Sequence, residues 1–129
     1  MFYLDTSAAV KLVVVEKGSK ALREWLASRD GQIASSDLLR TELLRTTRRA
    51  APEQMVQARA VLDSLILVTM STAVFERAAM LEPGVLRSLD ALHLAAALEF
   101  GDELEGIITY DHRQVEACRV LGISVVRPS

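Results

Sequence analysis

The stretch Phe2–Ser7, FYLDTS, carries the pattern on which the fold prediction depends. A short apolar run ends at an acid, Asp5, and a helical pattern begins at once, near Thr6. The same order recurs near the C-terminus, where GIITY (Gly106–Tyr110) is followed by Asp111 and another helical pattern. Short apolar runs of this kind are typical of strands that are buried on both faces. The two copies therefore predict two buried strands, each followed directly by a carboxylate.

Short apolar runs alternate with longer helical patterns along the whole chain. The predicted strands are residues 2–4, 31–35, 65–69, 106–110 and 123–126, and the predicted helices begin near residue 6 and cover 19–28, 36–49, 52–64, 72–81, 88–100 and 111–121. Strands that alternate with helices favour a parallel sheet joined by right-handed crossovers and covered on both faces. We therefore predict an α/β fold, an α/β/α sandwich with a parallel sheet of four to five strands.

Length and composition are those of an ordinary globular domain. The chain has 129 residues, half of them hydrophobic, and a net charge of -2, so we expect one domain over residues 1–129. A nucleic-acid partner would have to be held by a local basic patch. The single cysteine, Cys118, rules out an intrachain disulfide, and no signal peptide or apolar run of about 18 residues is visible. We expect a cytoplasmic protein.

Four acids lie where a buried site would need them. Ligands of open parallel sheets bind beyond the carboxyl ends of the strands, which is where Asp5 and Asp111 are predicted. Asp90, in SLDALHLAAALE (Ser88–Glu99), shares a helical stripe with Leu94 and Leu98, and a carboxylate on such a stripe is costly to bury. Glu42, in SSDLLRTELLR, likewise falls inside an apolar arc.

A divalent cation would explain this set of carboxylates. Four uncompensated carboxylates would repel one another and raise their pKa values. Mg²⁺ and Mn²⁺ prefer oxygen ligands and are typically held by a few carboxylates together with substrate phosphates. Zinc is disfavoured because no cysteine or histidine pair lies at ligand spacing.

Each acid also has a structural explanation. Asp90 follows a plausible N-cap, Ser88, by two residues, and Asp5 and Asp111 could cap the helices that follow them. Glu42 could pair with Arg45 three residues on. His93 could be a general base or a ligand, but we interpret it as a hydrogen-bonded structural histidine.

The four acids together resemble the signature of a known family. Asp5 within LDTSA, Glu42 within SSDLLRTELLR, Asp90 within LDALHLAAA and Asp111 within ITYDHR match the order and spacing of acids in PIN-domain ribonucleases, and in VapC-type toxins in particular. The resemblance implies a sheet of order 3-2-1-4-5. It implies that the four acids bind one or two Mg²⁺ or Mn²⁺ ions, and that Thr6 and Thr109 orient them.

The same resemblance implies an activity and partners. The activity is endonucleolytic hydrolysis of RNA that leaves 5′-phosphate and 3′-hydroxyl ends, by the toxin of a type II toxin-antitoxin pair. The implied partners are RNA, a cognate antitoxin and a second copy of the chain in a homodimer. Three arginines are candidates for RNA contact: Arg113, beside Asp111, and Arg45 and Arg49 of the run RTTRR.

Other functions fit the sequence less well. A haloacid-dehalogenase-like phosphatase would need a second aspartate where this chain has Ser7, and a receiver domain would need a phospho-acceptor where Met70 and Ser71 stand. A non-catalytic RNA- or protein-binding module of the same fold, or a housekeeping RNA-processing nuclease, stays open because fold alone does not give activity.

Overall fold

A computed structural model describes all 129 residues of the chain. The strands are β1 (Phe2–Leu4), β2 (Ile33–Ser36), β3 (Ile66–Val68), β4 (Gly106–Ile108) and β5 (Val125–Val126). The α-helices are α1 (Thr6–Lys11), α2 (Ser19–Ala27), α3 (Asp37–Ala50), α4 (Met55–Ser64), α5 (Thr72–Met80), α6 (Ser88–Leu98) and α7 (His112–Leu121), with short 3₁₀ helices η1 (Pro52–Gln54) and η2 (Gly101–Glu103). No helix is both long and apolar enough to cross a membrane.

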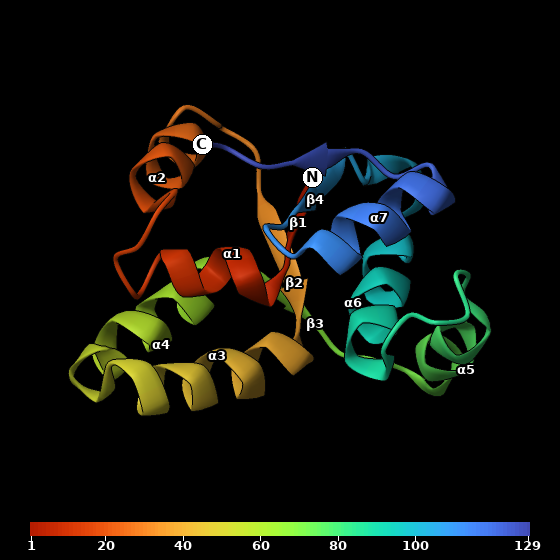
Figure 1. The fold of residues 1–129 in the computed structure, drawn as a ribbon, viewed down its shortest axis with the longest axis horizontal. Coiled ribbons are helices and arrows are strands. Elements are labelled where there is room, and N and C mark those ends of the chain that lie inside the picture. The colour runs from red at the N-terminus through yellow and green to blue at the C-terminus, as the bar shows by residue number, and fades with distance from the viewer.

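The five strands form one sheet in the order β3-β2-β1-β4-β5, and every neighbouring pair is parallel (Figure 1). The predicted parallel sheet and its order are therefore confirmed. Its two central strands, β1 and β4, lie side by side with Leu4 opposite Ile108. Residues that follow these two strands, from opposite ends of the sequence, consequently meet at one edge of the sheet.

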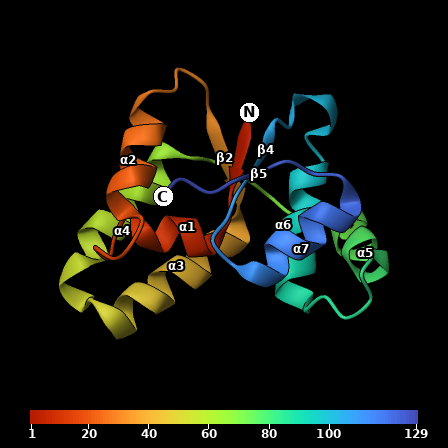
Figure 2. The same ribbon diagram turned by 45° about the horizontal axis from the view of Figure 1, so that its top comes forward.

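Helices cover both faces of the sheet (Figure 2), with α1 to α4 on one side and α5 to α7 on the other. Successive strand residues divide between two cores, as the two-residue period of a strand requires. Tyr3 and Ile107 belong to the core beneath α5, α6 and α7. Leu4 and Ile108 belong to the core beneath α1, α3 and α4. Burial on both faces explains why these strands are continuously apolar.

The apolar character of α6 follows from its position between the sheet, α5 and α7. Its buried residues, Ala91, His93, Leu94, Ala95, Ala96 and Ala97, occupy more than one side of the helix. A helix that is apolar on several sides is buried on several sides. Its first turn, which contains Asp90, lies at the end that faces the carboxyl edge of the sheet.

The main errors of the sequence prediction lie at element boundaries. The strand expected at 106–110 ends at Ile108, because Thr109 and Tyr110 already turn towards α1. The helix expected at 52–64 begins as η1. Gly122 ends α7 as expected, in a left-handed conformation with φ of 72°. Gly101 does not end α6, which stops at Leu98.

Candidate active site

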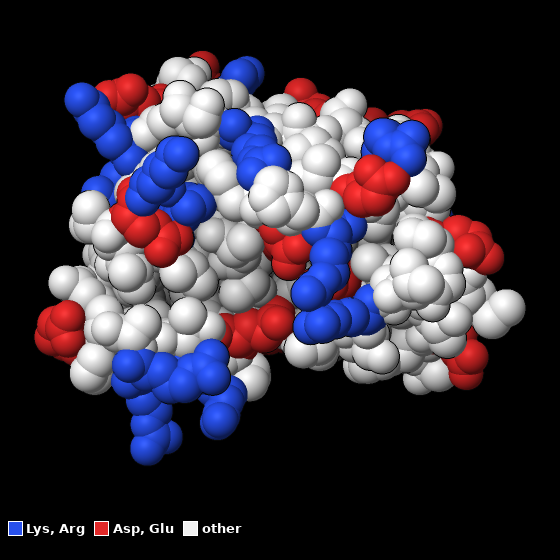
Figure 3. Space-filling view, in the orientation of Figure 1, with Lys and Arg blue, Asp and Glu red and all other residues white.

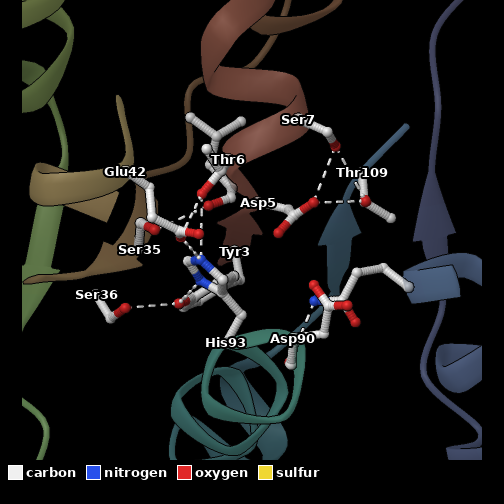
Figure 4. Close-up of polar contacts among 12 residues, drawn as sticks. Tyr3, Asp5, Thr6, Ser7, Ser35, Ser36, Glu42, Asp90, His93 and Thr109 are labelled. Carbon is white, nitrogen blue, oxygen red and sulfur yellow. Dashed lines mark hydrogen bonds and ion pairs between the residues drawn. The ribbon is translucent and has the colours of Figure 1, made fainter. Parts of the chain in front are cut away.

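Asp5 is a nearly buried carboxylate at the carboxyl end of β1. Its side chain is 4% exposed, and its Oδ2 accepts hydrogen bonds from Ser7 Oγ (2.9 Å) and Thr109 Oγ1 (2.8 Å), as Figure 4 shows. Asp5 occupies the N-cap position of α1 but makes no side-chain cap bond. The capping interpretation of Asp5 is therefore wrong. The two hydroxyls fix the carboxylate towards the space between β1 and β4.

The turn that follows β4 is fastened to the same hydroxyls. The Asp111 N–H donates to Thr109 Oγ1 (3.2 Å), and the Tyr110 N–H donates to Ser7 Oγ (2.9 Å). Asp111 itself caps α7, since its Oδ1 accepts from the Arg113 N–H at 2.8 Å. The capping interpretation is thus correct for Asp111. The Thr109 hydroxyl, which accepts from the Asp111 N–H, donates to Asp5 and so links the two acids.

Asp90 is half-buried in the first turn of α6, opposite Asp5 in Figure 4. Burial raises its pKa, and the negative charges of Asp111 and Asp5 raise it further, with a smaller contribution from Glu42 and an opposing one from His93. Ser88 does not cap α6, because Arg87 occupies the N-cap position and makes no side-chain bond. Asp90 therefore lies close to other carboxylates, and the N-cap that the sequence suggested at Ser88 is not formed.

Glu42 belongs to a separate hydrogen-bonded group on the α3 side of the site. Its Oε1 lies 2.5 Å from His93 Nε2 and accepts from Thr6 Oγ1 at 2.8 Å (Figure 4). The other ring nitrogen of His93 lies 2.8 Å from the Tyr3 hydroxyl, which donates to Ser36 Oγ at 3.0 Å. Arg45, the alternative structural partner that the sequence offered for Glu42, does not pair with it; His93 does. His93 is 2% exposed and joins α6 to β1, α1 and α3.

These contacts set the ionisation of the group. Burial raises the pKa of Glu42, but the hydrogen bond and the charge attraction of His93, with the Thr6 hydroxyl, more than offset it, so its pKa lies below the ordinary value. Burial raises the pKa of Tyr3, and the nearby Asp5 and Glu42 charges act in the same direction. Glu42 is therefore held as a carboxylate and Tyr3 as a neutral phenol.

The donor set fits a hard divalent cation. Asp5, Asp90 and Asp111 come together at the carboxyl end of β1 and β4, and their mutual repulsion at Asp90 is what a cation would relieve. Thr109 bonds to Asp5, and Thr6 bonds to Glu42. As the side chains stand, no three His, Cys, Asp or Glu residues are arranged to hold a metal ion. The single cage of four carboxylates stays a prediction.

Basic side chains lie beside the acids. Figure 3 shows Asp and Glu side chains at the middle of this face, between the two groups of helices, with Lys or Arg side chains next to them. Arg113 follows Asp111 by two residues and is exposed, as are Arg45 and Arg49 on α3. Their role in RNA contact stays a prediction.

Sequence reasoning missed three residues of the site. Ser7 binds Asp5, Tyr3 binds His93, and Gln114 donates from its Nε2 to the main-chain oxygen of Asp90 at 3.2 Å. Gln114 is fully buried, and its Oε1 has no hydrogen-bond partner. It lies three and four residues before the buried Ala117 and Cys118, so the stripe argument used for Asp90 could have found it. Tyr3 gave no signal, because an aromatic residue in a strand is typical of a core.

The comparison with known sequences identifies the family. The chain matches the PIN domain over residues 2–120. The chain belongs to the PIN domain family. This PIN domain is 42% identical to ribonuclease VapC47 and 39% identical to ribonuclease VapC46, both from Mycobacterium tuberculosis. The alignments cover 99% and 98% of this chain and 97% of each relative. The resemblance drawn from the four acids is therefore confirmed over the full length.

Solved structures show the same fold at lower identity. The crystal structure of VapC20 from Mycobacterium tuberculosis, described as a toxin that cleaves the sarcin-ricin loop, superposes with a TM-score of 0.80 at 18% identity, covering 99% of this PIN domain and 100% of that chain. A toxin-antitoxin complex from Klebsiella pneumoniae gives a TM-score of 0.74 at 23% identity, covering 100% and 98%.

Replacing His93 should destabilise this PIN domain. His93→Leu fills the same place in the core with an apolar side chain but deprives Glu42 and Tyr3 of a buried partner, which costs about 1–3 kcal/mol of unfolding free energy. Urea denaturation would measure the loss. The other histidine, His112, is exposed, so His112→Leu is the matched control and should change stability little. Equal stability of the two variants would show that the His93 bonds do not hold the site together.

The raised pKa of Asp90 predicts a pH-dependent penalty in the metal-free protein. The folded chain binds the Asp90 proton more tightly than the unfolded chain, so stability falls as pH rises from the ordinary value of 3.8 through the raised one. Asp90→Asn should therefore be more stable than the parent at neutral pH in EDTA, and the difference should vanish in acid. Urea titrations across this range would measure it, with the exposed Asp63→Asn as control. A variant less stable than the parent at neutral pH would contradict the repulsion.

Proposed function

We propose that this PIN domain is a metal-dependent endoribonuclease and the toxin of a type II toxin-antitoxin pair. The observation that carries the proposal is the meeting of Asp5, Asp90 and Asp111 at one end of the sheet, close enough for Asp111 and Asp5 to raise the pKa of Asp90. About 40% identity to ribonucleases over the full length supports the same chemistry. Acids that are costly to place at the edge of a core are hard to explain by folding alone.

The carboxylates of Asp5, Asp90, Asp111 and Glu42 would hold Mg²⁺ or Mn²⁺. Such an ion activates water and stabilises charge on a phosphate. In the overall reaction, a water oxygen bonds to phosphorus and the bond to the 3′ oxygen breaks, leaving a 5′-phosphate and a 3′-hydroxyl. The chain contributes fixed orientation: Ser7 and Thr109 hold Asp5, and the cap bond of α7 holds Asp111.

Glu42 has a different part from the three aspartates. His93 and Thr6 keep it ionised and hold it on the α3 side. Both contacts are made to Oε1, so Oε2 would be the oxygen available to a bound ion. Thr6 and His93 therefore act as positioning residues for Glu42, while Thr109 and Ser7 position Asp5.

RNA needs positive charge around this negative centre. Arg113, at the start of α7, and Arg45 and Arg49, on α3, are exposed on opposite sides of the acids. We assign them to phosphate contacts that position the strand without reading its sequence. A cation held by these carboxylates would reduce the repulsion that they exert on the same strand.

The partners follow from the same assignment. A toxin of this type is controlled by a cognate antitoxin, and a solved structure of the same fold is a toxin-antitoxin complex. We propose that this PIN domain binds such an antitoxin and forms a homodimer. Its RNA substrate places its action in the cytoplasm.

Asp90→Asn should abolish both metal binding and cleavage while leaving the fold intact. Loss of one carboxylate ligand should lower the cleavage rate of total RNA in Mg²⁺ or Mn²⁺ by about 100-fold or more. Isothermal titration with Mn²⁺ supplies a readout that does not depend on activity. Asp63→Asn, which changes an exposed acid on α4, should behave as the parent.

The outcomes separate the nuclease from its alternatives. A parent protein that neither binds Mn²⁺ nor cuts RNA would point to a non-catalytic module of the same fold. Cleavage by Asp90→Asn at the parent rate would remove Asp90 from the site.

A further inference from the structure

A basic pocket lies at Tyr110, the residue before Asp111. It has a volume of about 480 Å³ and is walled by Lys11, Lys17 and Gly18 on one side and by Tyr110, Arg127 and Pro128 on the other. In Figure 2 the chain after β5, which carries Arg127 and Pro128 of the pocket, crosses above α1 towards α2. Several Lys and Arg side chains gather on this part of the surface in Figure 3.

The pocket is built around Tyr110. The Tyr110 hydroxyl donates to the Pro128 carbonyl at 2.6 Å, which fastens the C-terminal segment over the pocket. Lys11 Nζ lies 4.6 Å from the centre of the Tyr110 ring and covers one of its faces. Gly18 has a left-handed φ of 91°, and a Cβ there would lie 3.4 Å from Tyr110 Cε1. A glycine is therefore what lets the α1–α2 loop turn this close to the ring.

Two of the three cations are free to bind an anion. Lys11 Nζ is already used, because it pairs with Glu16 at 3.2 Å and donates to the Lys17 carbonyl at 2.7 Å. Lys17 and Arg127 are exposed and take part in none of the ion pairs of the structure. The N-terminus of α2, which starts after Gly18, adds partial positive charge to the same wall.

Backbone and hydroxyl bonds connect this pocket to the acids. Tyr110 lies between Thr109 and Asp111, and its N–H donates to Ser7 Oγ, which in turn donates to Asp5. An RNA strand with one phosphate at the Asp5–Asp111 site would therefore pass the mouth of the pocket only a short distance along its backbone. The pocket suits an anionic group better than a stacked base, because Lys11 already covers one face of Tyr110, the only aromatic ring that lines it.

We propose that Lys17 and Arg127, whose backbone segments are fastened at the Tyr110 pocket by the bonds of Lys11 and Tyr110, bind a backbone phosphate of single-stranded RNA beside the cleaved bond. This inference rests on the proposed nuclease function and extends its site. The pocket would hold the strand on the α2 side, while Arg113 holds it on the α7 side. The binding is to phosphate, so it should be insensitive to base sequence.

The test compares two double variants of equal charge. Lys17→Ala with Arg127→Ala removes the pocket cations, and Arg59→Ala with Arg77→Ala removes two exposed cations on α4 and α5. Fluorescence anisotropy would follow a labelled single-stranded RNA of about ten nucleotides in EDTA, at several salt concentrations. The pocket variant should bind about tenfold more weakly at low salt, and its salt slope should fall by about 0.7, because one phosphate contact on a single strand contributes about 0.7. The control variant should bind as the parent does.

Two results would overturn the inference. One is an equal loss of affinity and of salt slope in both double variants, which would mean that only net charge matters. The other is that a labelled oligoglutamate peptide of equal charge binds as tightly as the RNA and loses as much in the pocket variant, which would make the pocket a site for an acidic protein segment.

Failure here is distinguishable from failure of the nuclease proposal. Mn²⁺ titration reports on the aspartates and should be unchanged in the pocket variant. If Mn²⁺ binds and RNA is cut but the pocket variant keeps the parent salt slope, the pocket alone is wrong. If the pocket variant loses RNA affinity but the parent binds no Mn²⁺, the nuclease assignment is wrong and the pocket stands.

Discussion

The two hydrogen bonds that hold Asp5 are the contacts on which the rest of the site depends. Thr109 directly follows β4, the strand next to β1, and Ser7 lies in the first turn of α1, so the carboxylate is fixed only when β1 and β4 are paired. The same hydroxyls receive the N–H groups of Tyr110 and Asp111. Closing the sheet between distant parts of the chain therefore orients two acids and one wall of the basic pocket in a single step.

Charge repulsion is the cost of this arrangement, and the structure manages it in two ways. On the α3 side, His93 and Thr6 stabilise the Glu42 carboxylate and keep its pKa low. At the centre, burial and the charges of Asp111 and Asp5 raise the pKa of Asp90, and the charge of His93 offsets only part of this effect. The charge of Glu42 is compensated within the chain, whereas the repulsion at Asp90 is offset only in part. A cation bound there would remove this repulsion and so stabilise the folded protein.

The sequence predicted the sheet and the place of the acids because both depend on simple periodicities. Buried strands such as Gly106–Ile108 are short apolar runs, and Asp90 stood out because it interrupted a leucine stripe. The hydrogen-bond partners were not predictable in this way. Whether Glu42 pairs with Arg45 or with His93 depends on how α3 and α6 approach each other, which no local pattern records. The basic pocket was missed for the same reason, since Lys17 and Arg127 lie at opposite ends of the chain.

The most direct measurement of the central claim is a crystal structure grown with Mn²⁺ and measured at the manganese absorption edge. The account predicts an anomalous peak at the carboxyl end of β1 and β4, within bonding distance of Asp5, Asp90 and Asp111 oxygens, with Glu42 turned towards it directly or through a water. An anomalous peak only at some other place, or no peak at the carboxyl end of β1 and β4 in crystals saturated with Mn²⁺, would contradict it.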